Sequence, residues 1–78
     1  MFKGDLRKYN YWMKIIINGI EKNYTSSFTL ETLLIELGYA NKKVAVEVNK
    51  EVIPRFELRN KLVVEGDKIE IINAIGGG

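Results

Sequence analysis

A single leucine stripe in the middle of the chain limits the fold more than any other feature. Four leucines recur at i, i+3, i+4 and i+7, the spacing of one helix face: Leu30, Leu33, Leu34 and Leu37. Thr29 before them is a good N-cap, and Gly38 after them supplies the left-handed residue that ends many helices. The stripe predicts one amphipathic helix packed on a core.

The segments around this helix have the patterns of short strands. Residues 14–17 are a lysine followed by three β-branched isoleucines, and residues 20–25 alternate, with Asn18-Gly19 between them as a strong two-residue hairpin signal. Residues 44–48 and 68–73 also alternate. We expect order to begin at Met13.

The stretch between the last two long strands is harder to interpret. Val52-Ile53 begins a short strand that Pro54 restricts to an edge or a strand end. Residues 55–61 are predicted to form an irregular connection, with Leu58 and Leu62 as anchors. Gly66-Asp67 belongs to a turn, where Asp67 is expected to be a turn residue rather than a catalytic acid.

The order strand, strand, helix, strand, short strand, strand predicts an α+β fold in which one helix covers one face of a sheet. Seven residues should face the helix: Ile15, Ile17, Val44, Val46, Val48, Ile69 and Ile71. Five should face outward: Ile16, Ala45, Glu47, Glu70 and Ile72. If the last strand pairs with the first, Ile16 and Ile72 lie on neighbouring strands. Exposed isoleucines there could mark a partner site or need no explanation.

The residue inventory argues against an enzyme. The 78 residues allow one domain. With no cysteine there is no disulfide and no thiolate zinc site, and with no histidine there is no imidazole base and no common transition-metal site. No acidic residues stand at a metal-ligand spacing, and no glycine-rich phosphate loop is present. We therefore expect neither catalysis nor a metal or cofactor bound by this chain.

Charge and hydrophobicity suggest where the chain acts. Residues 1–12 hold four of the eight aromatic residues, and Lys3, Arg7 and Lys8 against Asp5 give them the whole net charge of +2. Residues 13–78 are neutral, without the basic stripe of a nucleic-acid binder. No apolar run is long enough for a membrane span, and charges interrupt the start where a signal peptide would be apolar. We expect a cytoplasmic protein that binds neither nucleic acid nor membrane.

Three of the seven glycines are the last three residues, Gly76, Gly77 and Gly78. Residues without Cβ can pass a narrow channel and let an enzyme's backbone approach closely. We therefore divide the chain into an N-terminal extension (1–12), a folded domain (13–73) and a flexible tail (74–78). The glycines are either a frayed end without a role or a means of delivering the chain's own carboxylate to a buried site.

Residues 13–78 resemble the ThiS family of sulfur-carrier proteins of thiamin biosynthesis, which have the ubiquitin-like β-grasp fold. The resemblance rests on segments that follow in order: Ile17-Asn18-Gly19, Thr29-Leu30, Leu33-Leu34, Val44-Ala45-Val46, Val48-Asn49, Ile53-Pro54-Arg55, Gly66-Asp67, Ile69-Glu70-Ile71 and Ala74-Ile75-Gly76-Gly77-Gly78. Two departures are residues 1–12, which precede the usual start, and Phe56-Glu57-Leu58, which lacks a tryptophan common in the family. The resemblance implies a mixed sheet with one helix on one face.

The resemblance also implies a mechanism. A ThiF-like adenylating enzyme would use ATP and magnesium to convert the Gly78 carboxylate to an acyl-adenylate. A sulfur donor enzyme would then supply persulfide sulfur, giving a thiocarboxylate that delivers sulfur to a ThiG-like thiazole synthase. Gly77 and Gly76 would line the threaded tail. Ile16, Ile72, Ala45 and Arg55 would contribute docking surface.

Three alternatives remain at this point. The small subunit of molybdopterin synthase would use the same carrier chemistry, although its members often carry paired prolines where this chain has Asn73-Ala74-Ile75. A β-grasp interaction module with an inert terminus would not need the last glycines. A ubiquitin-like modifier would be conjugated to lysines through an isopeptide bond.

Overall fold

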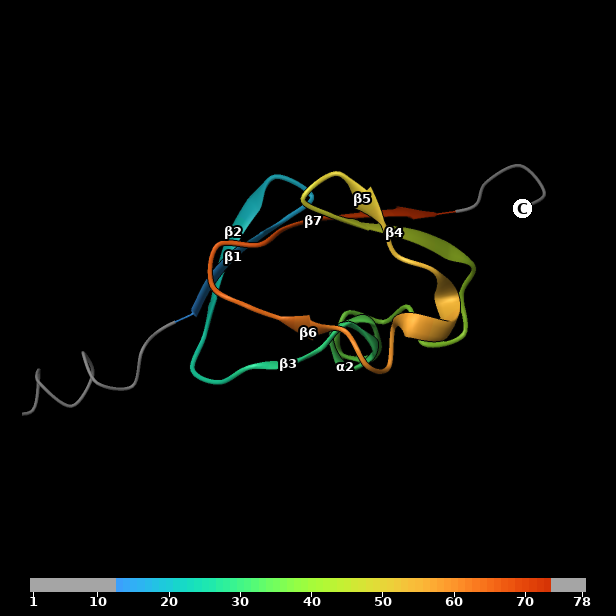
Figure 1. The fold of residues 1–78 in the computed structure, drawn as a ribbon, viewed down its shortest axis with the longest axis horizontal. Coiled ribbons are helices and arrows are strands. Elements are labelled where there is room, and N and C mark those ends of the chain that lie inside the picture. The colour runs from blue at the N-terminus through green and yellow to red at the C-terminus, as the bar shows by residue number, and fades with distance from the viewer. Residues whose placement is uncertain (1–12, 74–78) are drawn as a thin grey trace, which may run out of the picture.

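The computed structural model describes residues 13–73, which form a five-stranded sheet with a helix against one face (Figure 1). The sheet contains β1 (Met13–Ile17), β2 (Ile20–Tyr24), β4 (Val44–Val48), β5 (Glu51–Val52) and β7 (Lys68–Asn73). Their order across the sheet is β2-β1-β7-β4-β5. The predicted extension at 1–12 and the predicted flexible tail at 74–78 lie outside the described residues.

The first two strands form the predicted hairpin. Met13 to Ile17 pairs antiparallel with Ile20 to Tyr24, so that Ile17 lies opposite Ile20. The two turn residues both have positive φ, 49° at Asn18 and 83° at Gly19. A two-residue turn of this kind needs residues that tolerate the left-handed region, which Asn-Gly does at little cost.

The last strand lies in the middle of the sheet. β7 pairs parallel with β1, with Ile16 opposite Lys68. On its other side it pairs antiparallel with β4 over the whole length of that strand, from Val44–Asn73 to Val48–Ile69. The sheet is therefore mixed, as predicted, and the last strand does pair with the first.

The helix α2 (Leu30–Glu36) has the predicted ends. The Thr29 hydroxyl accepts a hydrogen bond from the Thr32 N–H at 3.2 Å, which satisfies one of the free donors of the first turn. Gly38, at φ 93°, follows the C-cap Leu37 and donates its N–H to the Ile35 carbonyl. These two residues limit the helix to the segment that carries the leucine stripe.

One core lies between the helix and the inner face of the sheet. The inner positions of the sheet are buried as predicted, except that Val44, at the end of β4, is half-buried. The buried hydrophobic residues are Met13, Ile15, Ile17, Leu30, Leu33, Leu34, Val46, Val48, Ile53, Val63, Ile69 and Ile71. Burial of side chains of this size contributes about 1.5–3 kcal/mol each, so the core is the main source of stability.

Three short elements were not predicted. β3 (Phe28–Thr29) and β6 (Leu62–Val63) pair to form a two-stranded sheet, and η1 (Arg55–Glu57) is one 3₁₀ turn. The prediction that Leu62 anchors this connection is wrong, because the Leu62 side chain is 55% exposed. Its neighbour Val63 is fully buried instead. Leu58 does pack against the core, as expected.

An aromatic pair connects β2 to the small sheet. The rings of Tyr24 and Phe28 pack edge to face with their centroids 4.7 Å apart. Burial, and secondarily the carboxylate of Glu36, raises the pKa of the Tyr24 phenol above its ordinary value. Tyr24 therefore keeps its proton over the physiological range.

Asp67 is a buried structural residue that organises the turn before β7. Its carboxylate accepts hydrogen bonds from the Val64 N–H at 2.9 Å and from the Asn49 side-chain amide at 3.0 Å. The Asn49 side-chain oxygen in turn accepts the Lys68 N–H. These bonds join the β4–β5 turn to the start of β7, and they confirm that Asp67 is a turn residue.

Replacing Asp67 with Ala is expected to lower the free energy of unfolding by about 2 kcal/mol. The change leaves a backbone donor at Val64 and an amide donor at Asn49 without their acceptor, and such losses cost about 1–3 kcal/mol each when the groups are shielded from water. Urea denaturation measures the effect. Glu51→Ala, on the exposed edge strand, is the control, and equal midpoints for the two variants would contradict this account.

Candidate functional site

β7 leads to the three C-terminal glycines, of which Gly78 is the predicted reactive residue. Gly76, Gly77 and Gly78 lie outside the described residues. β7 ends at Asn73, which is the last described residue and is paired with Val44 of β4. The three glycines therefore follow, after Ala74 and Ile75, the middle strand of a five-stranded sheet.

Asn18 holds the end of β7 beyond the point where β1 stops. The Asn18 N–H donates to the Ile69 carbonyl at 2.9 Å, and the Asn18 side-chain oxygen accepts the Ile71 N–H at 2.8 Å. The side chain thus takes the place of a backbone acceptor that β1 no longer provides. The sequence pattern predicts Asn18-Gly19 only as a turn, because the register that brings Asn18 to β7 depends on distant residues.

The outer face of the sheet carries the predicted docking residues in two separate places. Ile72 lies opposite Ala45 on β4, and its side chain is 49% exposed. Ile16 is half-buried and lies opposite Lys68, four residues before Ile72 along β7. Strand residues advance about 3.3 Å each, so Ile16 and Ile72 do not form one patch. The apolar surface near the tail is made by Ile72 and Ala45.

Two carboxylates face each other next to that apolar pair. Glu47 on β4 lies opposite Glu70 on β7, and both point to the outer face, since their strand neighbours are buried. Val52 of β5 lies opposite Glu47 on the other side and is 63% exposed. Val52 was expected in a short strand but not among the docking residues, because a two-residue strand is too short for alternation to show which side chain faces outward.

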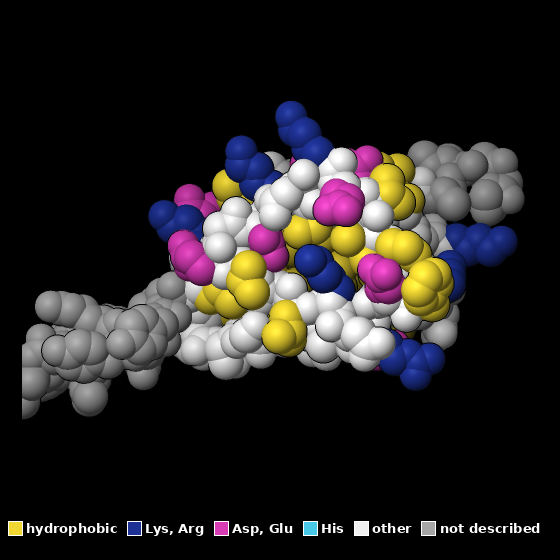
Figure 2. All heavy atoms as spheres, in the orientation of Figure 1, with side chains coloured by type: hydrophobic (Ala, Val, Ile, Leu, Met, Phe, Trp, Pro, Cys, Tyr) yellow, Lys and Arg dark blue, Asp and Glu magenta, His cyan; other side chains and the backbone are white. Residues whose placement is uncertain are grey.

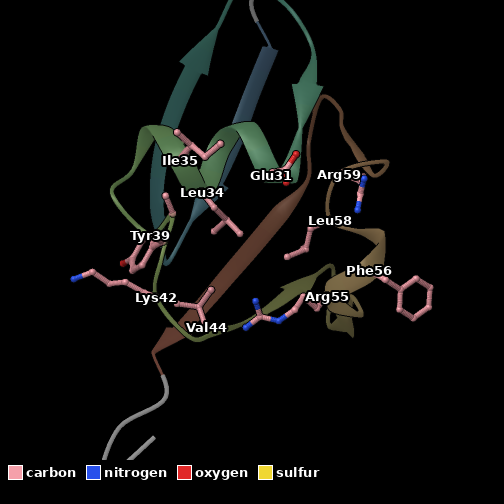
Figure 3. A pocket seen from close by; sticks show the side chains of 11 residues that line it. Glu31, Leu34, Ile35, Tyr39, Lys42, Val44, Arg55, Phe56, Leu58 and Arg59 are labelled. Atoms are coloured by element: carbon pink, nitrogen blue, oxygen red, sulfur yellow. The ribbon is translucent and has the colours of Figure 1, made fainter.

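Arg55 lies on the other side of the molecule from Ile72 and Ala45. It begins η1 and lines a groove between α2, the connection from α2 to β4, and η1 (Figure 3). We call this the η1 groove; its apolar floor includes Leu34, Val44 and Leu58. The structure therefore does not join Arg55 to the outer face, where its predicted docking role would have placed it.

A comparison with known protein families identifies the family of this chain. The family model described as the ThiS family matches residues 15–78, which include all of the paired strands except the start of β1, and also the three glycines. The chain belongs to the ThiS family.

Individual relatives agree with this membership. The crystal structure of the ThiS thiamine biosynthesis protein from Geobacter metallireducens matches with a TM-score of 0.73 at 32% identity, covering 85% of this chain and 100% of that one. The sulfur carrier protein ThiS of Escherichia coli K12 is 27% identical over 66 residues, covering 85% of this chain and 100% of that protein. The fold is thus the ubiquitin-like β-grasp, as the sequence predicted.

A longer relative also contains a matching segment. A thiazole synthase of Paramagnetospirillum magneticum is 50% identical over 66 residues, which cover 85% of this chain but 20% of that protein. The chain therefore spans about a fifth of the length of this relative. ThiS-type sequence is found in a protein named for thiazole synthesis as well as in separate small proteins.

Three features of the described part of this ThiS family member concern metal-binding clusters, membrane-spanning helices and charged patches. Between residues 13 and 73 no three acidic side chains gather in a way that could hold a metal ion. Over the same residues no helix has the length and apolar character to cross a membrane. On the face shown in Figure 2, lysines and arginines are interspersed with acidic side chains and form no single basic patch.

Replacing Glu47 with Gln is expected to raise the free energy of unfolding by about 0.5 kcal/mol. The change removes a like-charge pair directly across two strands, and such pairs are destabilising by a few tenths of a kcal/mol. The gain should shrink at high salt, which screens the repulsion. Urea denaturation at low and high salt tests this, with Glu51→Gln on exposed β5 as control; an unchanged or lower midpoint for Glu47→Gln would refute it.

Proposed function

We propose that this chain is a sulfur carrier that supplies sulfur for the thiazole of thiamin, with the Gly78 carboxylate as the group that carries it. One observation is central: three glycines follow the middle strand of a ThiS family β-grasp domain. The names of its relatives, a sulfur carrier protein, a thiamine biosynthesis protein and a thiazole synthase, support the same pathway.

The proposed chemistry takes place on the carboxylate in two stages. An oxygen of the Gly78 carboxylate attacks the α-phosphate of ATP, pyrophosphate leaves, and an acyl-adenylate forms. The terminal sulfur of a persulfide then attacks the acyl carbon and AMP leaves. A thiol cleaves the resulting S–S bond, which leaves a thiocarboxylate on Gly78 and a disulfide on the donor side.

In this scheme the chain is a substrate and not an enzyme. ATP and magnesium are bound by a ThiF-like adenylating enzyme, and the persulfide by a sulfur donor enzyme. A ThiG-like thiazole synthase receives the sulfur. We place these reactions in the cytoplasm, where ATP is available to the activating enzyme. Gly76 and Gly77 act by lacking Cβ, since they let the tail pass through a narrow channel.

The outer face next to the tail is the proposed docking surface for the adenylating enzyme. Ile72 and Ala45 are exposed and lie side by side two residues from the point where the tail begins. An exposed apolar group among charged residues can serve as a contact for a partner. Glu47 and Glu70 beside it repel each other in the free chain, and a basic group of a partner would relieve that repulsion.

Incubation with an active adenylating enzyme, ATP and a sulfur donor is expected to convert the chain ending at Gly78 to a thiocarboxylate. Intact-mass analysis should show an increase equal to the replacement of one oxygen by sulfur. If the mass does not change although the enzyme is active toward another carrier, the carrier proposal fails.

A variant at the same residue separates chemistry from folding. Gly78→Trp should block adenylation because the bulky side chain cannot enter a channel shaped for glycine. Its urea midpoint should equal that of the parent chain. A loss of folded structure in this variant would mean that the tail has a structural role, contrary to the proposal.

Ile72→Asp is expected to weaken binding to the adenylating enzyme about tenfold or more, since it places a charge in the centre of the apolar contact. Ile72 is half-exposed, so the domain should still fold. Ile20→Asp makes the same change at a 62% exposed residue on the far edge strand β2. Calorimetric titration compares the two, and an equal loss in both variants would argue against docking at Ile72.

A further inference from the structure

The η1 groove is a second surface with the properties of a binding site. Its volume is about 600 Å³, and it lies on the helix side of the sheet, away from Ile72 and Ala45. In Figure 3 the side chains of Leu34 and Leu58 point toward each other between α2 and η1, while the Phe56 ring points outward from η1. The proposed carrier chemistry makes no use of this groove.

Apolar side chains form the floor of the groove and part of its rim. Its floor is made by Leu34, which is buried, and by the half-buried residues Val44 and Leu58. Two large hydrophobic side chains stand at its rim: Phe56 is 74% exposed and Ile35 is 57% exposed. Ile35 on α2 and Phe56 on η1 stand on opposite sides of the groove (Figure 3), and exposed apolar groups that flank an apolar floor can mark a contact surface for another molecule.

The charges around the groove are predominantly positive. Lys42, Arg55 and Arg59 line it, against one carboxylate, Glu31. Within residues 13–73 the ion pair found is Lys14–Glu21, on the far side of the sheet, so the three cations are not neutralised by a neighbour in the described structure. Figure 3 shows the Arg55 guanidinium directed toward Val44, over the apolar floor. The rim therefore favours an acidic partner.

The walls of the groove are already fixed in the free domain. The first turn of α2 is bonded to the η1 side, with the Glu31 N–H donating to the Leu58 carbonyl at 3.0 Å and the Leu30 N–H to the Lys61 carbonyl at 2.9 Å. On the opposite wall the Lys42 N–H donates to the Tyr39 carbonyl at 3.0 Å. A preformed groove avoids the entropy cost of ordering its walls when a ligand binds.

We propose that the η1 groove binds an acidic segment of a partner protein, whose apolar side chains fill the floor and whose carboxylates face Lys42, Arg55 and Arg59. Charge complementarity argues against two other occupants. Residues 1–12 carry a net charge of +2, like the groove rim, and a second copy of the groove would present the same positive charges.

The η1 groove lies close to the residue after which the tail begins. Val44, at the groove floor, is the residue paired with Asn73, after which the tail begins. A segment bound in the groove would lie beside the exit of the tail while Ile72 and Ala45 remained free on the outer face. The inference does not depend on carrier chemistry, because binding can be measured without ATP or sulfur.

Two short amphipathic peptides are the probes, one with leucines at i, i+3, i+4 and i+7 and glutamates elsewhere, the other with lysines in place of the glutamates. The full chain is titrated with each and followed by amide chemical shifts. The glutamate peptide should shift signals of residues that line the groove, and the lysine peptide should shift none. No binding of the glutamate peptide, equal binding of the two, or shifts confined to the outer face would each overturn the proposal.

Charge reversal at the rim gives a matched test. The double variant Arg55→Glu, Arg59→Glu should bind the glutamate peptide about tenfold less tightly, since it replaces two weak attractions with repulsions. Lys22→Glu, Lys50→Glu makes the same change in net charge at exposed lysines on β2 and in the β4–β5 turn. Thermal melts verify that both fold, and an equal loss in the control would mean that net charge alone drives binding.

Discussion

The pairing of β7 between β1 and β4 is the interaction on which the rest of this domain depends. It joins residues from both ends of the folded segment, with Ile16 opposite Lys68 on one side and Val44 opposite Asn73 on the other. Ile69 and Ile71 thereby enter the centre of the core beneath α2. The same strand leads to the three glycines, so the central strand of the sheet is also the route to the proposed reactive residue.

Much of this architecture could be predicted from local pattern. The leucine stripe with Thr29 and Gly38 gave the helix and its ends, and the alternation of residues 44–48 and 68–73 gave the two faces of the sheet. The β3–β6 pair and η1 were missed because two or three residues cannot show a period. The prediction that Leu62, and not Val63, is the buried anchor was wrong for a related reason. Adjacent strand residues face opposite sides, and only the pairing with Phe28 decides which one is buried.

The candidate site was harder to predict than the fold, because it depends on register between distant strands. Ile16 and Ile72 were expected on neighbouring strands and are there, but a four-residue offset separates them and brings Ala45 to Ile72 instead. Arg55 was grouped with them by sequence motif, yet η1 turns it to the helix side. The domain consequently presents two distinct surfaces near one tail, an outer face with apolar and acidic groups and a groove with apolar and basic ones.

The central position of β7 has a mechanical consequence. In the proposed reaction, an enzyme that draws the tail into a channel would pull on Asn73 along the axis of the strand. Because β4 pairs with residues 69–73 of β7 and Asn18 is bonded to β7 on the other side, the load would act on several hydrogen bonds at once, in shear, and would not open them one after another from an edge. Under the proposed function, tension on the glycines would be borne by the sheet as a unit, and the chain could be held firmly by its end while its domain stays folded.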